Sequence, residues 1–186
     1  MSRGLGAIEA VRSLLPEGGV EALAALTALG DFVVVFLVLV AVYVFYDREG
    51  GAVALVVFAG GALLITGLKA GLAMPRPPES LQAVPEDGYG FPSGHAFSAT
   101  VGFGLLALVI RRGRRSVRFG LAALGIALVS LSRVAIGVHY AVDVLAGAAL
   151  GVAYLWVAWA GRDRLSTAVN RVRRRVRSES SLGRQS

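Results

Sequence analysis

The chain has 186 residues, of which 55% are hydrophobic, and it carries a formal net charge of +7 at pH 7. Its length predicts one domain. Its hydrophobic fraction exceeds the roughly 45–50% apolar share of soluble domains, which predicts an integral membrane protein. Because the chain has no cysteine, disulfides and thiol chemistry are excluded.

The N-terminal segment, residues 1–30, is predicted to be an interfacial helical segment. Residues 5–15 are amphipathic and end at Pro16. They are too short to span a bilayer, so a helix lying at the membrane interface is expected. No cleaved signal peptide is predicted, since the basic, apolar and small-residue pattern is missing. A sixth span over residues 5–29 is the alternative, although Pro16 and Glu17 disfavour it.

Five later segments are apolar enough to approach the roughly 20 residues that cross about 30 Å of hydrocarbon. They are residues 32–46 (extendable back to 23), 52–72, 93–110, 117–134 and 139–161. The sequence therefore predicts an all-α integral membrane helical bundle of about five spans. Residues 31–161 would form the transmembrane domain, and residues 162–186 a basic cytoplasmic tail.

Two groups of arginines flank these segments and set the expected orientation. They are Arg111, Arg112, Arg114, Arg115 and Arg118, and Arg162, Arg164, Arg171, Arg173, Arg174, Arg175 and Arg177. Nucleic-acid binding is an alternative, but basic loops beside apolar spans ordinarily face the cytoplasm. We therefore expect a multi-pass cell-membrane protein that binds no nucleic acid, has a cytoplasmic C-terminus and contacts anionic lipids through its tail. Residues 73–92 and 132–139 would then face outward.

A first block, which holds a pair of cations, follows the second span. Lys69 is the only lysine in a chain with 18 arginines, and Arg76 lies seven residues later, between Pro75 and Pro77. The neighbouring prolines stiffen this loop and fix the direction of Arg76. The alternative is that both cations only snorkel to the lipid headgroups.

A second block, Pro92-Ser93-Gly94-His95, opens the third span. Ser93 occupies a favourable N-cap position. The backbone amides of Gly94 and His95 would then point outward at the positive end of the helix dipole, where anions bind. A capped helix with an incidental histidine is the alternative.

The third block is Ser132-Arg133, five residues, His139, three residues and Asp143. His139 and Asp143 are four apart and therefore share a helix face. A carboxylate bonded to one ring nitrogen leaves the other free to attack, as in catalytic triads. Alternatively, Asp143 and Arg133 pair only to neutralise buried charge.

Together the three blocks resemble the signature of the type 2 phosphatidic acid phosphatase (PAP2) superfamily, whose membrane members commonly have six spans. The resemblance implies that His139 attacks phosphorus, that Asp143 stabilises the resulting imidazolium, and that His95 is the general acid and base. The groups it implies for holding the phosphate oxygens are Lys69, Arg76, Ser93, Gly94 and Arg133.

The expected activity is therefore hydrolysis of a lipid phosphate or diphosphate headgroup through a phosphohistidine, without a metal or other cofactor. Polyprenyl diphosphate, phosphatidic acid and phosphatidylglycerol phosphate remain open as substrates, as does the oligomeric state. One alternative is a lipid phosphotransferase. Another is a non-catalytic protein that binds or transports phospholipid or polyprenyl phosphate, although pure binding would need only the cations.

Overall fold

The computed structural model describes residues 5–171, and over that range its regular secondary structure is all helical, without a β-strand. Its α-helices are α1 (Leu5–Ser13), α2 (Gly19–Leu26), α3 (Phe32–Phe45), α4 (Arg48–Leu72), α5 (Gly94–Val109), α6 (Arg115–Ala135) and α7 (Ala141–Ala160). Two short 3-10 turns, η1 (Thr27–Gly30) and η2 (Glu79–Leu81), complete them. Beyond Gly161 the chain is helical again to residue 171. The arginines at 173–177 lie outside the described residues.

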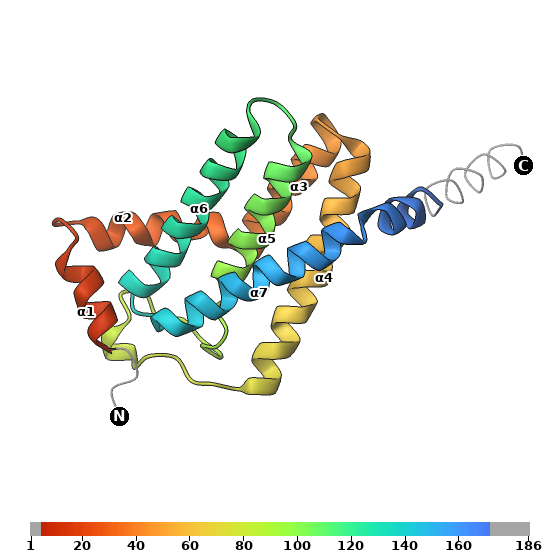
Figure 1. Cartoon of the computed structure of the whole chain (residues 1–186). Coiled ribbons are helices and arrows are strands. Elements are labelled where there is room, and N and C mark those ends of the chain that lie inside the picture. Colours follow the sequence, from red (N-terminus) through yellow and green to blue (C-terminus); the bar gives the residue numbers. More distant parts are fainter. Residues whose placement is uncertain (1–4, 172–186) are drawn as a thin grey trace, which may run out of the picture.

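Helix α5 is the centre of the bundle, with α6 and α7 packed most extensively against it (Figure 1). Twelve of its 16 residues are buried. By contrast, the outer faces of α4 and α7 expose large apolar side chains such as Leu63, Leu145 and Trp156. Apolar exposure of this extent is expected of a surface that faces lipid.

All five segments predicted to span are helical, but they differ in length. Helices α4, α6 and α7 are long and apolar enough to cross a membrane alone. A fourth span requires the bent pair Gly19–Gly30 and Phe32–Phe45, whose parts meet at 51°. Helix α5 is shorter, about 24 Å at 1.5 Å per residue. Because protein rather than lipid surrounds it, α5 does not have to match the bilayer thickness.

Polar caps explain where the predicted helix boundaries shift. The Asp47 carboxylate accepts hydrogen bonds of 3.0 Å from the backbone N–H groups of Glu49 and Gly50, so α4 begins at Arg48, before the predicted residue 52. The Asp143 carboxylate accepts a 2.9 Å bond from the N–H of Tyr140. Helix α7 therefore begins at Ala141 and leaves residue 139 in the preceding turn.

The N-terminal segment packs on the bundle. Ile8 of α1 is buried in a cluster with Val134 of α6. The Arg12 guanidinium donates to the carbonyl oxygens of Ala135 and Leu81, each at 2.7 Å. Helix α1 thus ties the end of α6 to the long segment that joins α4 and α5.

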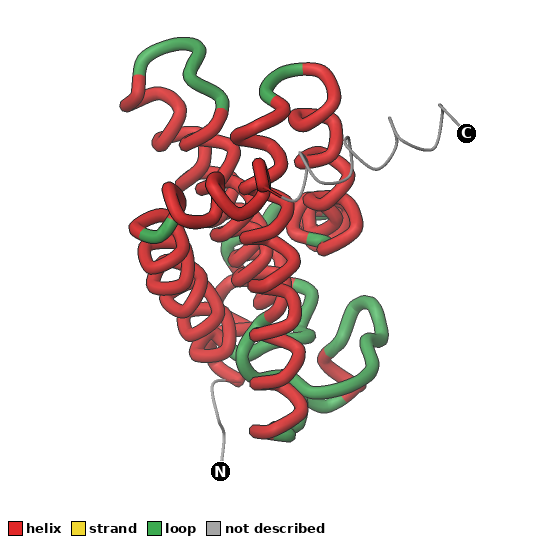
Figure 2. Tube along the Cα trace, turned by 90° about the vertical axis from the view of Figure 1, so that its right-hand side faces the viewer, coloured by secondary structure: helices red, strands yellow, loops and turns green. Residues whose placement is uncertain are grey.

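The connections lie at two ends of the bundle. The α3–α4 and α5–α6 turns share one end, and the α4–α5 segment and the α6–α7 turn share the other (Figures 1 and 2). The second end carries all three sequence blocks.

Candidate active site

His139 lies in the α6–α7 turn with only 1% of its surface exposed. Its Nδ1 is 3.5 Å from Oδ2 of Asp143, which the N–H of Tyr140 holds in place. This separation suits an ion pair but is long for a hydrogen bond, and His139 Nδ1 has no hydrogen-bond partner among residues 5–171. Catalytic hydrogen bonds are often loose before substrate binds and tighten as charge develops.

Arg76 contacts one of the two ring nitrogens of His139. Its Nη1 lies 3.1 Å from His139 Nε2 and also donates to the Val138 carbonyl at 3.1 Å. A guanidinium can only donate, so Nε2 accepts and the ring proton is assigned to Nδ1, facing Asp143. In this tautomer Nε2 carries the lone pair of the ring, and a phosphoryl group attacked by it would first have to take the place of the Arg76 N–H.

Arg133 ends α6 and is 2% exposed. Its Nη1 donates to Thr27 Oγ1 at 3.0 Å, and its Nη2 contacts Glu86. The alternative in which Arg133 pairs with Asp143 is not what the structure shows. Thr27 and Glu86 are therefore its partners, and neither belongs to the three sequence blocks.

The second block forms the cap that the sequence predicts. Ser93 is fully buried, and its Oγ accepts from the N–H of Ala96 at 3.4 Å. Its own N–H donates to the Asp143 carbonyl at 2.9 Å, which joins the second block to the third. The backbone N–H groups of Gly94 and His95, the first two residues of α5, have no partner within the helix and are available to an anion.

Lys69 of the first block lies close to Gly94, at the start of α5. A Cβ built at this position would lie 3.9 Å from Lys69 Nζ and 3.3 Å from the ring of Phe32. The absence of a side chain keeps the start of α5 open toward the Lys69 ammonium. The structure therefore places Lys69 at the end of α5 that carries the free amides.

His95, in the first turn of α5, is half-buried. It lies within electrostatic reach of Arg133, Glu86 and His139. Its ring makes no hydrogen bond to the residues that the structure describes, so both nitrogens remain available to a ligand. All eight residues predicted for the site thus lie at one end of the bundle.

Sequence reasoning missed Glu86. This carboxylate contacts Arg133 and lies 3.1 Å from Arg76 Nη2. Burial raises the pKa of Glu86, but the charges of Arg133 and Arg76 outweigh burial and hold it below its usual value. Its only sequence signal was its place in the loop that follows Arg76.

An apolar cavity of about 600 Å³ adjoins this end of the bundle. Its lining combines Met74, Pro75, Phe91, Tyr140 and Val142 with Asp143. The cavity therefore runs from hydrophobic side chains to the carboxylate beside His139. Such a lining suits the apolar part of a ligand whose polar end lies at the site.

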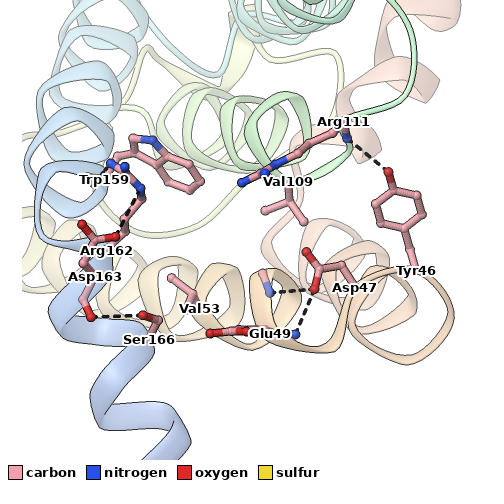
Figure 3. A pocket seen from close by; sticks show the side chains of 11 residues that line it. Tyr46, Asp47, Glu49, Val53, Val109, Arg111, Trp159, Arg162, Asp163 and Ser166 are labelled. Atoms are coloured by element: carbon pink, nitrogen blue, oxygen red, sulfur yellow. Dashed lines mark hydrogen bonds and ion pairs between the residues drawn. The ribbon is translucent and has the colours of Figure 1, made fainter.

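A cavity of about 470 Å³ lies at the opposite end, where α4, α7 and the α5–α6 loop meet (Figure 3). Its charged lining comprises Arg111, Arg162, Asp47, Glu49 and Asp163. Three carboxylates against two guanidiniums give no cationic excess. The residues predicted to bind phosphate all lie at the other end. Among residues 5–171, no group of three or more metal-ligating side chains lies together.

Comparison with known proteins identifies the family of the chain. The PAP2 superfamily model matches residues 50–166. Phosphatidylglycerophosphatase B of Bacillus subtilis is 30% identical over 142 residues, which cover 71% of this chain and 70% of that protein.

Two solved structures share the fold. The transmembrane PAP2-type phosphatidylglycerolphosphate phosphatase of Bacillus subtilis matches with a TM-score of 0.69 and 25% identity, covering 84% of this chain and 83% of its own. Aquifex aeolicus LpxE matches with a TM-score of 0.71 and 21% identity, and the match covers 86% of this chain and 96% of LpxE. The chain belongs to the PAP2 superfamily and is a multi-pass membrane lipid phosphatase, a phosphoric monoester hydrolase.

Proposed function

We propose that the protein hydrolyses a phosphate or diphosphate monoester headgroup through a phosphohistidine on His139. The observation that carries this proposal is the contact of Arg76 with His139 Nε2, which selects the tautomer and places a cation beside the attacking nitrogen. Attack forms the Nε2–P bond and breaks the P–O bond to the lipid. Asp143, 3.5 Å from Nδ1, would stabilise the imidazolium that forms.

His95 is proposed to protonate the departing lipid oxygen and then to take a proton from the water that cleaves the phosphohistidine. This division into two steps is the usual benefit of covalent catalysis. Lys69, Arg76 and Arg133, with Ser93 and the Gly94 amide, would bind the phosphoryl oxygens. Preorganised donors of this kind stabilise the charge of the transition state.

The substrate proposed first is phosphatidylglycerol phosphate, since the Bacillus subtilis phosphatase that this chain resembles in sequence and in structure is named for it. Phosphatidic acid and polyprenyl diphosphate present the same terminal phosphoryl group, and the apolar cavity beside Asp143 would accept hydrocarbon from any of them. The site is proposed to face outward, with residues 162–186 cytoplasmic and their arginines against anionic lipid. Residues 31–161 would form the catalytic domain, and residues 1–30 an interfacial segment.

Phosphate release from these three lipids, measured in detergent with EDTA present, tests the function. The expected result is turnover of at least one lipid that EDTA leaves unchanged and that His139→Ala abolishes. Activity that EDTA removes and Mg²⁺ restores would contradict the metal-independent mechanism. Transfer of the phosphoryl group to an acceptor other than water would indicate a phosphotransferase.

A further inference from the structure

Glu86 joins two arginines from different parts of the fold. Its Oε1 lies 3.1 Å from Arg76 Nη2, and its Oε2 contacts Arg133 Nη2. The two arginine side chains are 7% and 3% exposed, whereas that of Glu86 is 30% exposed. The carboxylate therefore enters the phosphate site from its open side.

Glu86 occupies the one guanidinium nitrogen of Arg76 that has no other partner among the described residues. Arg76 Nε donates to the Asp87 carbonyl at 3.2 Å, and Nη1 is used by Val138 and His139. Nη2 is thus the nitrogen left for an incoming anion, and Glu86 holds it. Carboxylates and phosphates bind guanidinium groups with the same geometry, so the two compete for these N–H groups.

Arg133 shows why a phosphoryl group can displace the carboxylate. Glu86 contacts its Nη2 and Thr27 its Nη1, but the buried Nε has no hydrogen-bond partner in the part of the chain that the structure describes. A phosphoryl group offers three terminal oxygens and can bind both Nε and Nη2. A buried unpaired donor is costly, so satisfying it favours the phosphoryl group.

Between Glu86 and Arg133, the glutamate is the partner that can move. Glu86 lies in a segment without regular secondary structure, residues 82–93. Its backbone N–H is held by Gln82 Oε1 at 3.0 Å, while Gln82 Nε2 donates to the Pro77 carbonyl at 2.9 Å. Arg133 is fixed at the end of a packed helix.

We propose that Glu86 is an internal anionic ligand of the phosphate site, displaced whenever a substrate phosphoryl group or orthophosphate binds. This inference rests on the proposed function only in placing phosphate at Arg76 and Arg133. An internal competitor lowers the apparent affinity of every anion that must displace it by one common factor. Glu86 would thereby weaken product inhibition, at the cost of a higher KM.

Glu86→Gln tests the proposal by removing the charge while keeping the size. The expected result is a fall in KM for the lipid and in Kd for orthophosphate by the same factor, on the order of tenfold, or about 1.4 kcal/mol. Glu79→Gln removes a charge from the same segment at an exposed position that contacts neither arginine, and should change neither constant. Gln82→Ala, which only loosens the segment, should lower both constants by a smaller common factor.

A rise in the Kd for orthophosphate on Glu86→Gln would overturn the proposal. If Glu86 only positions the arginines, Glu86→Gln should weaken orthophosphate binding and lower kcat. Calorimetric titration with orthophosphate in detergent needs no turnover, so it separates this inference from the proposed activity. Tighter orthophosphate binding by an inactive protein would support the role of Glu86 and refute the activity, whereas unchanged binding by an active phosphatase would refute only the role of Glu86.

Discussion

Among the cations of the site, Lys69 differs from the two arginines. Arg76 and Arg133 both contact Glu86, whereas the Lys69 ammonium forms no ion pair in the part of the chain that the structure describes. Lys69 Nζ instead lies toward the start of α5, near the position that a Cβ of Gly94 would take. It is therefore the cation with its full charge available to a phosphoryl oxygen.

Replacing Lys69 by arginine should lower kcat about tenfold, because a planar guanidinium cannot take the place of a compact ammonium in this space. The loss should appear in kcat more than in KM, since the contact strengthens as charge builds in the transition state. Steady-state kinetics on the lipid would measure it. Arg48→Lys, at an exposed position of the same helix, is the matched control, and wild-type turnover by Lys69→Arg would show that any cation suffices.

At the scale of elements, the site depends on close contact between α5 and α7. Gly147 of α7 lies directly against the backbone of Ser93, where a Cβ would clash with the carbonyl oxygen and lie 3.2 Å from the nitrogen. The same nitrogen donates to the Asp143 carbonyl. Small residues permit this approach between membrane helices, and here the approach aligns the Ser93 cap with the His139–Asp143 pair.

Gly147→Ala should therefore destabilise the protein by about 1–3 kcal/mol, the usual cost of overpacking. Activity should fall as well, because the Ser93 cap would shift relative to Asp143. Thermal unfolding in detergent and phosphate release would measure the two effects. Gly67→Ala is the control, since a Cβ at Gly67 meets nothing within 4 Å, and equal effects of both substitutions would contradict this role for the contact.

Most of the helices could be predicted from the sequence, but the Asp47 cap and the position of Glu86 could not. Hydropathy located all five helices from α3 to α7, and Ser93 was correctly placed as a cap. The start of α4 was wrong by four residues because the Asp47 cap extends it beyond the apolar run. Glu86 was missed because its partners lie 10 and 47 residues away, and only the folded chain brings them together.

Across the whole molecule, the two ends of the bundle differ in chemistry. One end holds the three blocks around His139, and the other holds the arginine-rich α5–α6 loop and the start of the basic tail (Figure 1). Arginine-rich loops are retained in the cytoplasm. The expected orientation therefore exposes the site to the outer leaflet, where it would meet lipid headgroups directly.

Single cysteines test this orientation, since the chain has none of its own. Ser80→Cys, in the segment between α4 and α5, should react with an impermeant thiol reagent applied to intact cells. Ser116→Cys, at the start of α6, should react only after permeabilisation. Both positions are exposed, so accessibility within the fold does not distinguish them, and the reverse pattern would invert the orientation.

The central claim, that His139 carries the phosphoryl group, is tested most directly by trapping the phosphoenzyme. Denaturing the protein during turnover of a radiolabelled aryl phosphate should yield an acid-labile, base-stable label on the wild-type chain. His139→Ala should carry no label and show no turnover. His95→Ala should accumulate label, because the leaving group needs no proton while water attack lacks its base. Label or near-normal turnover in His139→Ala would contradict the account.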